Sequence, residues 1–286
     1  PAGHRLPEEV RLGEVRLQVA DLDRSIAYYK KILGLQVIEN SGSRAALGVQ
    51  GSKQVIVELN EKPGVTPVPR RGRLGLYHYA ILLPAREALG SFVQHLESLG
   101  EYAGMADHFV SEAVYLTDPD GLGIEVYADR PSASWATTGP ILNMGSVHLD
   151  VEDLIRSAQG KPWEGVPAGT RIGHVHLYVS DLRVAEKFYH NAVGFDKVNL
   201  DFPGALFLSA GGYHHHVGLN IWQGRGAPPP PEDAVGLRYF TVEFPNQGAM
   251  DEAIANIDKA GVSYNKTDEG ILLYDPSQNG VMLKLR

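Results

Sequence analysis

Histidine and acidic residues are the side chains of this sequence that could hold a metal ion. The chain of 286 residues contains 11 His, 34 Asp and Glu together, and no Cys. The absence of Cys excludes thiolate metal sites, iron–sulfur clusters, disulfides and a cysteine nucleophile. A transition metal in this protein would therefore be bound by imidazole nitrogen and carboxylate oxygen.

Alternation along the predicted strands indicates which of these side chains share a face. In one predicted strand Val175, Leu177 and Val179 occupy every second position and form the face that packs on a helix. His174 and His176 alternate with these residues and therefore lie on the inner face. The same reasoning places His78 and Glu125 on the inner faces of their strands. A carboxylate among apolar strand neighbours is costly unless it is paired or bound to a metal.

The candidate metal site consists of His78, Glu125 and His174. Two imidazoles and one carboxylate leave open positions on a non-haem Fe(II), or sometimes Mn(II), for a substrate and dioxygen. A single His in a strand is more often an ordinary polar residue than a ligand. Three such residues at equivalent positions of a repeated unit favour the metal site instead.

The elements that must position these residues belong to a repeated unit. Residues 13–35 align without a gap with residues 173–195, and residues 74–100 align with residues 235–261. Each block begins with an alternating strand pattern and continues with apolar residues at helical spacing. Further short strand candidates follow each helix. We therefore expect an α+β protein of four βαβββ modules, which pair because one module cannot bury its sheet alone.

The longest and least periodic connection divides these modules into two halves. Residues 1–127 are predicted to hold modules one and two, residues 128–171 to form a linker, and residues 172–286 to hold modules three and four. This division places the candidate ligands in both halves of the chain.

Modules one and four differ from the other two at the matching positions. Glu14, Tyr239 and Met282 stand where the other modules have the candidate ligands. The predicted ligand set is thus confined to modules two and three.

The opening of each half resembles a known superfamily. An Asp-Leu pair begins at Asp21 and at Asp181, and Tyr29 and Tyr189 follow at the same spacing within the helix. This pattern is similar to that of the vicinal oxygen chelate superfamily, which includes glyoxalase I, bleomycin-resistance proteins and extradiol catechol dioxygenases. The resemblance covers nearly the whole chain and implies a cup-shaped mixed sheet for each pair of modules, with a metal or ligand inside the cup.

A second motif, in residues 106–125, narrows the resemblance. In chain order its characteristic residues are His108, Val114-Tyr115, Asp118-Pro119, Gly121 and Glu125. Their spacing is similar to the signature of extradiol ring-cleavage dioxygenases, and only the opening residue, Ala106, departs from it. A plain hairpin turn would explain Asp118-Pro119 and Gly121, but it would not explain His108, Tyr115 and Glu125 together.

The resemblance implies a role for each matching residue. His78, Glu125 and His174 would bind Fe(II), with Mn(II) as the alternative metal. His108 and Tyr115 would steer the bound substrate.

The acid/base residue is expected in the run from Tyr213 to Val217, which resembles the strand that carries this group in the family. Alternation with Val217 and Leu219 places His215 inward. The neighbouring His214 and His216, and also His176, stay open as alternatives.

The implied activity is cleavage of a catechol-type aromatic with dioxygen to a muconic semialdehyde type product. A glyoxalase-like lyase or isomerase would need a fourth ligand, where module three offers only Leu219 or Asn220. A metal-free binding protein of the same fold would have no reason to keep the three candidate ligands. Because module four lacks ligands, we expect module two to pair with module three, although pairing of one with two stays open.

The composition limits the partners. With 26 Lys and Arg the net charge is −8, and no basic cluster is long enough to bind nucleic acid. No apolar run approaches the length of a membrane span, and the first residues lack the order of a signal peptide. We expect a cytoplasmic homo-oligomer, with a small aromatic diol and dioxygen as partners and neither nucleic acid nor membrane.

Overall fold

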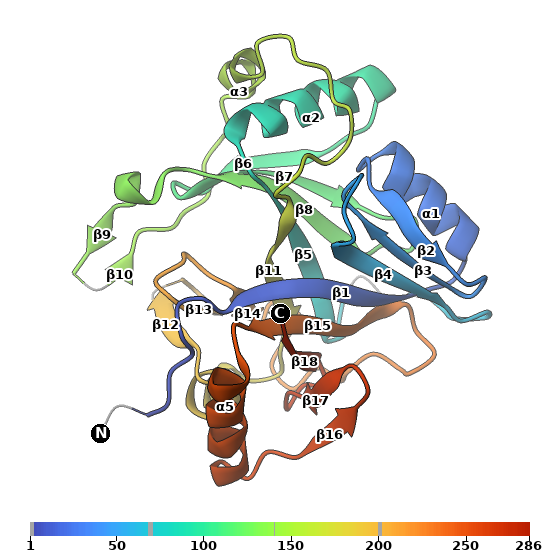
Figure 1. Cartoon of the computed structure of the whole chain (residues 1–286). Helices are drawn as coiled ribbons and strands as arrows, with labels where there is room; N and C mark the ends of the chain where they lie inside the picture. Colours follow the sequence, from blue (N-terminus) through green and yellow to red (C-terminus); the bar gives the residue numbers. More distant parts are fainter. Residues whose placement is uncertain (1–2, 68–70, 140, 200–201) are drawn as a thin grey trace.

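Two curled sheets form most of the molecule. A computed structural model describes residues 3–67, 71–139, 141–199 and 202–286. Within these residues the chain forms two mixed eight-stranded sheets and one two-stranded ribbon (Figure 1). The predicted α+β class with paired, cup-shaped sheets is confirmed.

The first sheet combines modules one and four. Its centre is the antiparallel pair of β1 and β15, which lie side by side in Figure 1. In order across the sheet its strands are β16 (Tyr264–Thr267), β17 (Gly270–Tyr274), β18 (Gly280–Leu285), β15 (Gly236–Phe244), β1 (Arg11–Val19), β4 (Val55–Glu61), β3 (Arg44–Gly48) and β2 (Gln36–Asn40).

The second sheet combines modules two and three around the antiparallel pair of β5 and β11. In order across the sheet its strands are β12 (Asp196–Asn199), β13 (Ala205–Ser209), β14 (Val217–Asn220), β11 (Arg171–Tyr178), β5 (Gly75–Leu83), β8 (Gly123–Asp129), β7 (Ser111–Thr117) and β6 (Gly104–Asp107). The expected pairing of module two with module three is therefore correct. Each half of the chain contributes one module to each sheet.

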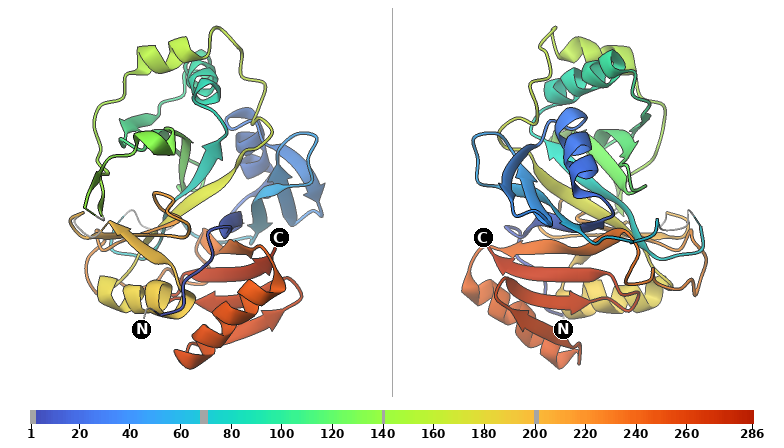
Figure 2. Two further views of the ribbon diagram at one scale, coloured as in Figure 1. Left: turned by 60° about the vertical axis from the view of Figure 1, so that its left-hand side comes forward. Right: turned by 90° about the vertical axis from the view of Figure 1, so that its right-hand side faces the viewer.

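Helices cover the outer faces of the sheets, and α2 and α5 lie at opposite ends of the molecule (Figure 2). They are α1 (Leu22–Lys31), α2 (Arg86–Leu99), α4 (Leu182–Glu186), which continues as the π-helical segment η2 (Lys187–Val193), and α5 (Gln247–Lys259). The Asp21 and Asp181 side chains accept hydrogen bonds from backbone N–H groups of the first turns, so the repeated Asp-Leu pair marks a helix N-cap. None of the described helices is long and apolar enough to cross a membrane.

The connection between the halves contains short elements. They are the 3₁₀ turn η1 (Ser132–Ser134), β9 (Thr137–Thr138), β10 (Ile141–Leu142) and α3 (Val151–Ser157). α3 packs closely on α2, because Gly90 of α2 has no side chain and a Cβ there would lie 2.3 Å from the Leu154 carbonyl oxygen. The division of the chain at residues 127 and 172 stays a prediction.

Two buried hydrogen bonds connect consecutive modules. The Tyr29 hydroxyl donates to Asp118 at 3.0 Å, and the Tyr189 hydroxyl donates to Asp275 at 2.9 Å. Tyr79 of the second sheet donates in turn to the Tyr29 oxygen. The repeated Tyr and the repeated Asp-Pro turn are therefore partners that hold the two sheets together.

We predict that Asp118 makes stability depend on pH. Burial raises the pKa of its carboxyl from 3.8 to about 6, although hydrogen bonds from the Leu122 N–H and the Tyr29 hydroxyl oppose the rise. The folded state thus holds this proton more tightly than the unfolded state. The contribution to the unfolding free energy is full below about pH 4 and is lost as the pH rises through about 6, by about 1–3 kcal/mol.

Urea unfolding at a series of pH values would measure this effect in the wild type and in Asp118→Asn, which cannot ionise. The stability difference between the two proteins should change over this pH range. A difference that is the same at all pH values would contradict the assignment.

Candidate metal centre

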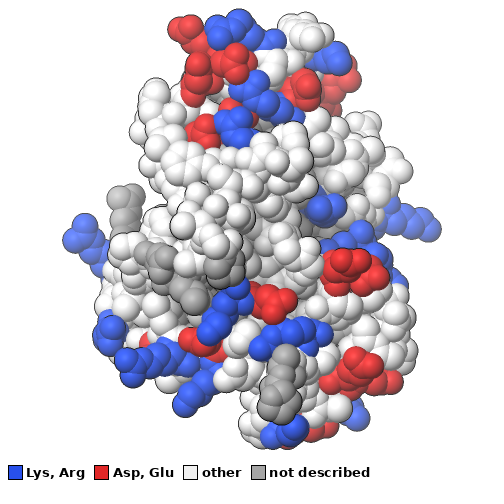
Figure 3. Space-filling view, turned by 90° about the vertical axis from the view of Figure 1, so that its left-hand side faces the viewer, with Lys and Arg blue, Asp and Glu red and all other residues white. Residues whose placement is uncertain are grey.

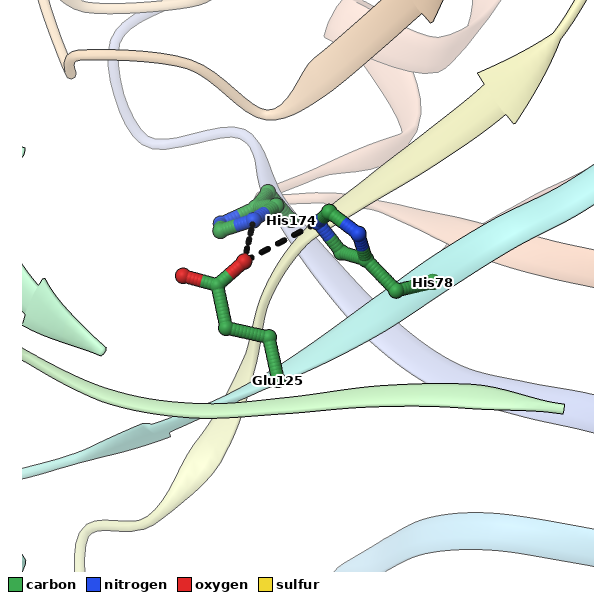
Figure 4. Close-up of side chains that lie close together, drawn as sticks. All are labelled: His78, Glu125 and His174. Carbon is green, nitrogen blue, oxygen red and sulfur yellow. Dashed lines mark hydrogen bonds and ion pairs between the residues drawn. The ribbon is translucent and has the colours of Figure 1, made fainter. Parts of the chain in front are cut away.

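His78, Glu125 and His174 meet at the centre of the second sheet, as Figure 4 shows. The Glu125 Oε2 atom lies 2.9 Å from the Nε2 atom of His78 and 2.9 Å from that of His174. One ligand atom from each residue lies within 4.8 Å of the others, and all three side chains are buried. This is the one group of three or more such residues found in the described part of the chain.

Strand register explains why these residues meet. Ala80 of β5 pairs with His174 of β11 on one side and with Glu125 of β8 on the other. His78 lies two residues before Ala80 and so faces the same side of the sheet. The small Ala80 side chain leaves space between the two larger ones.

The protonation states suit a cation. Burial alone would raise the pKa of Glu125, but its electrostatic interaction and hydrogen bonds with His174 and His78 hold it well below its ordinary value. Burial lowers the pKa of His174 to about 4, despite the opposing effect of Glu125. Ionised carboxylate and neutral imidazole are the forms that bind a metal ion, so the donor set fits one.

A cavity of about 290 Å³ opens beside these three residues. Its other lining residues include His108, Tyr115, His176, Phe207, His215 and Trp222. Of these, the aromatic wall formed by Phe207 and Trp222 was not predicted. Phe207 faces the cavity because it pairs with Gly218 of β14, a register that the continuous apolar sequence of β13 does not reveal.

His108 and Tyr115 form a hydrogen-bonded pair at the cavity. The His108 Nδ1 atom lies 2.7 Å from the Gly145 carbonyl oxygen, which can only accept, so Nδ1 carries the proton. The other ring nitrogen, Nε2, lies 2.5 Å from the Tyr115 hydroxyl oxygen. Burial and the adjacent Glu125 raise the pKa of Tyr115, which keeps the phenol protonated.

His215 lies in the cavity as expected, with its ring centroid 4.0 Å from that of His174. The reasoning from alternation was nevertheless wrong. Leu219 pairs with Leu177 and belongs to the core on the helix side of the sheet. Because β14 begins only at Val217, residues before it need not alternate.

The other candidates for the acid/base group lie in different places. His176 lines the cavity and its Nε2 atom is buried without a partner among the described residues. The His216 Nδ1 atom bonds the backbone N–H of Ala210, away from the cavity lining. His214 bonds Asp129 instead of facing the cavity.

The position for a fourth ligand is occupied by Gly218, which corrects the expectation of Leu219 or Asn220. His176 pairs with Gly218 in module three as Ala80 pairs with Glu125 in module two. A glycine supplies no ligand atom. A Cβ at this position would lie 3.0 Å from the His176 ring, so a larger residue there would displace that ring.

The first sheet also buries a glutamate, and there ion pairs neutralise its charge. Glu58 of β4 is buried and pairs with Arg16 at 2.5 Å, and Arg16 also pairs with Glu269 at 2.8 Å. The guanidinium therefore neutralises the buried carboxylate in this cup. Tyr239, which stands where the other sheet has His78, lies under the Arg16 guanidinium.

Among the described residues, few charged side chains lie at the centre of the side of the molecule that carries β10 and β12 (Figure 3). Met144 and Phe202, close to these strands in sequence, line the cavity. Figure 3 shows this side, with Lys, Arg, Asp and Glu gathered mainly above and below a central band.

The sequence profile of the Glyoxalase/Bleomycin resistance protein/Dioxygenase superfamily matches residues 11–126 and 171–282. The chain belongs to this superfamily, as its repeated modules predicted. The linker region between the two matched segments falls outside the profile.

Individual relatives agree with this assignment. The chain is 43% identical over 272 residues to the catechol-2,3-dioxygenase of Bacillus subtilis (strain 168), covering 94% of this chain and 95% of that protein. A putative dioxygenase from Bacillus subtilis subsp. subtilis str. 168 superimposes with a TM-score of 0.64 at 14% identity, covering 99% and 86% of the two chains. Glyoxalase I from Zea mays gives 0.55 at 16% identity, covering 96% and 92%. At these identities the two structures show likeness of fold.

We predict that a divalent ion stabilises the folded protein through these three residues. Adding Mn(II) to metal-free protein should raise the Tm, with a gain of about 2.7 kcal/mol when the free ion is 100-fold above its Kd. His174→Ala should abolish the shift, whereas His148→Ala, at an exposed position of the linker, should keep it. Equal shifts in both variants would mean that the ion binds elsewhere.

Proposed function

We propose that this protein is an extradiol dioxygenase, which opens the ring of a catechol-type aromatic with dioxygen to give a muconic semialdehyde type product. The observation that carries the proposal is the His78, Glu125 and His174 triad beside an aromatic cavity. The 43% identity to a catechol-2,3-dioxygenase over nearly the whole chain supports it. Both atoms of dioxygen enter the product, so the reaction needs no external reductant.

In this proposal His78, Glu125 and His174 hold Fe(II), with Mn(II) as the alternative. The ion would supply open coordination positions for the two diol oxygens and for dioxygen. One carboxylate and two neutral imidazoles leave a net charge of +1 on such a site. An anionic diol is therefore favoured over a neutral one.

The surrounding residues would orient the ring and move protons. His215 takes a proton from one diol hydroxyl, which its position in the cavity beside His174 allows. Burial, followed by the nearby His174, lowers the pKa of His215, so its ring is neutral and able to accept. Tyr115 and His108 offer the paired phenol and imidazole at the cavity wall, and Phe207 and Trp222 contact the faces of a flat ring.

Two other functions fit the site less well. A glyoxalase-like isomerase or lyase would use a fourth protein ligand, and Gly218 offers none. A metal-free binding protein would bury the Glu125 carboxylate with only its contacts to His78 and His174 to offset the cost of burial. A cytoplasmic location and a homo-oligomeric state stay predictions from the sequence.

We predict turnover of catechol with dioxygen to a yellow product when the protein is loaded with Fe(II). The moles of product, measured by absorbance, should equal the moles of dioxygen consumed, since both oxygen atoms are incorporated. Resorcinol is the control, because its two hydroxyls are too far apart to reach one ion. Dioxygen uptake without ring opening would contradict the proposal.

We also predict that His215→Phe keeps the metal but lowers kcat by roughly 10² to 10⁴, the usual range for losing a general acid or base. The reason is that His215 lines the cavity without bonding Glu125, unlike His174. Metal analysis and steady-state kinetics would separate the two effects. A variant with near-parental kcat would remove His215 from the mechanism.

A further inference from the structure

A chain of hydrogen bonds runs from the cavity wall to the end of β8. The Nδ1 atoms of His215 and His214 lie 2.9 Å apart, and the His214 Nε2 atom lies 2.7 Å from Oδ1 of Asp129. The His214 side chain is 1% exposed, whereas that of Asp129 is 24% exposed. Asp129 is the last residue of the strand that carries Glu125.

The direction of each hydrogen bond follows from chemistry. An ionised carboxylate can only accept, so the His214 Nε2 atom is the donor to Asp129. In the form of the His214 ring that donates through Nε2 and carries no second proton, the lone pair is on Nδ1 and accepts from His215. With this form of His214, His215 carries its proton on Nδ1, which leaves the lone pair on Nε2. No described residue bonds that Nε2 atom, and the ring lines the cavity.

Further contacts hold Asp129 and His214, which lie at the end of this series of hydrogen bonds away from the cavity. The Tyr213 hydroxyl donates to the same Asp129 oxygen at 3.3 Å, and the hydroxyls of Tyr213 and Tyr127 lie 2.5 Å apart. The Trp135 ring from the linker packs edge-on against His214, with centroids 5.3 Å apart. These contacts restrain both the carboxylate and the imidazole that bonds it.

We propose that Asp129 and His214 are positioning residues that fix the tautomer of His215, so that its Nε2 lone pair faces the cavity. The proposal deepens the dioxygenase function and rests on it for the role of His215. When a diol binds, its O–H bond breaks and an N–H bond forms at His215 Nε2. The positive charge on that ring is then stabilised through His214 by the Asp129 carboxylate.

The first test measures the tautomer of His215 directly and does not depend on catalysis. Nitrogen NMR of metal-free protein labelled with ¹⁵N-histidine distinguishes protonated from unprotonated ring nitrogens, and the resonances missing in His215→Phe identify His215. In the parent protein Nδ1 of His215 should be protonated and Nε2 should not. His214→Phe removes the acceptor of the His215 Nδ1 hydrogen bond. In this variant His215 should no longer prefer the tautomer that is protonated on Nδ1.

The matched control is Tyr213→Phe, which removes a different hydrogen bond to the same carboxylate. It should keep the tautomer, because the bond between His214 and Asp129 remains. Asp129→Glu, which retains a carboxylate, should restore most of what Asp129→Ala loses.

Kinetics provide the second measurement. His214→Phe should lower kcat by roughly 10- to 100-fold, the range for losing a group that orients a functional imidazole, with KM and metal content unchanged. A parent protein with the proton on Nε2 of His215, or an unchanged tautomer and kcat in His214→Phe, would overturn the proposal. The predicted tautomer in a protein that turns over no catechol would support the proton chain and overturn the dioxygenase function instead.

Discussion

The antiparallel register of β5 against β11 is the constraint on which the site depends. It pairs Ala80 with His174, and the parallel neighbour β8 pairs the same Ala80 with Glu125. A slip of one residue would turn His174 toward the helices and the helix-side residue into the cup. The large apolar core on the helix side of the sheet prevents this slip. Core packing thus determines which polar side chains face one another.

The two cups show two ways to keep a buried glutamate ionised. Glu125 receives hydrogen bonds from two imidazoles and lies beside a cavity, whereas Glu58 is paired directly with the Arg16 guanidinium. The Arg16 guanidinium is part of the protein and stays beside Glu58, so a substrate or a metal ion cannot take its place. The same module architecture therefore gives one cup suited to chemistry and one suited to stability.

Much of this arrangement could be predicted from local patterns. Alternation with a period of two indicated that His78, Glu125 and His174 face inward, and internal repetition indicated the modules and their pairing. The argument from alternation failed at His215, because the strand starts two residues later, and it misplaced Leu219 relative to Gly218. The hydrogen bond between Tyr29 and Asp118 could not be predicted, since only the folded chain brings these residues together.

The crossed pairing of modules also sets an order of assembly during translation. β1 is synthesised more than 200 residues before its central partner β15. Likewise, His78 and Glu125 are made well before His174, which completes the set. The nascent first half therefore exposes an unpaired strand edge, a feature that favours aggregation. Binding of an ion by all three residues has to wait until the second half has begun to fold.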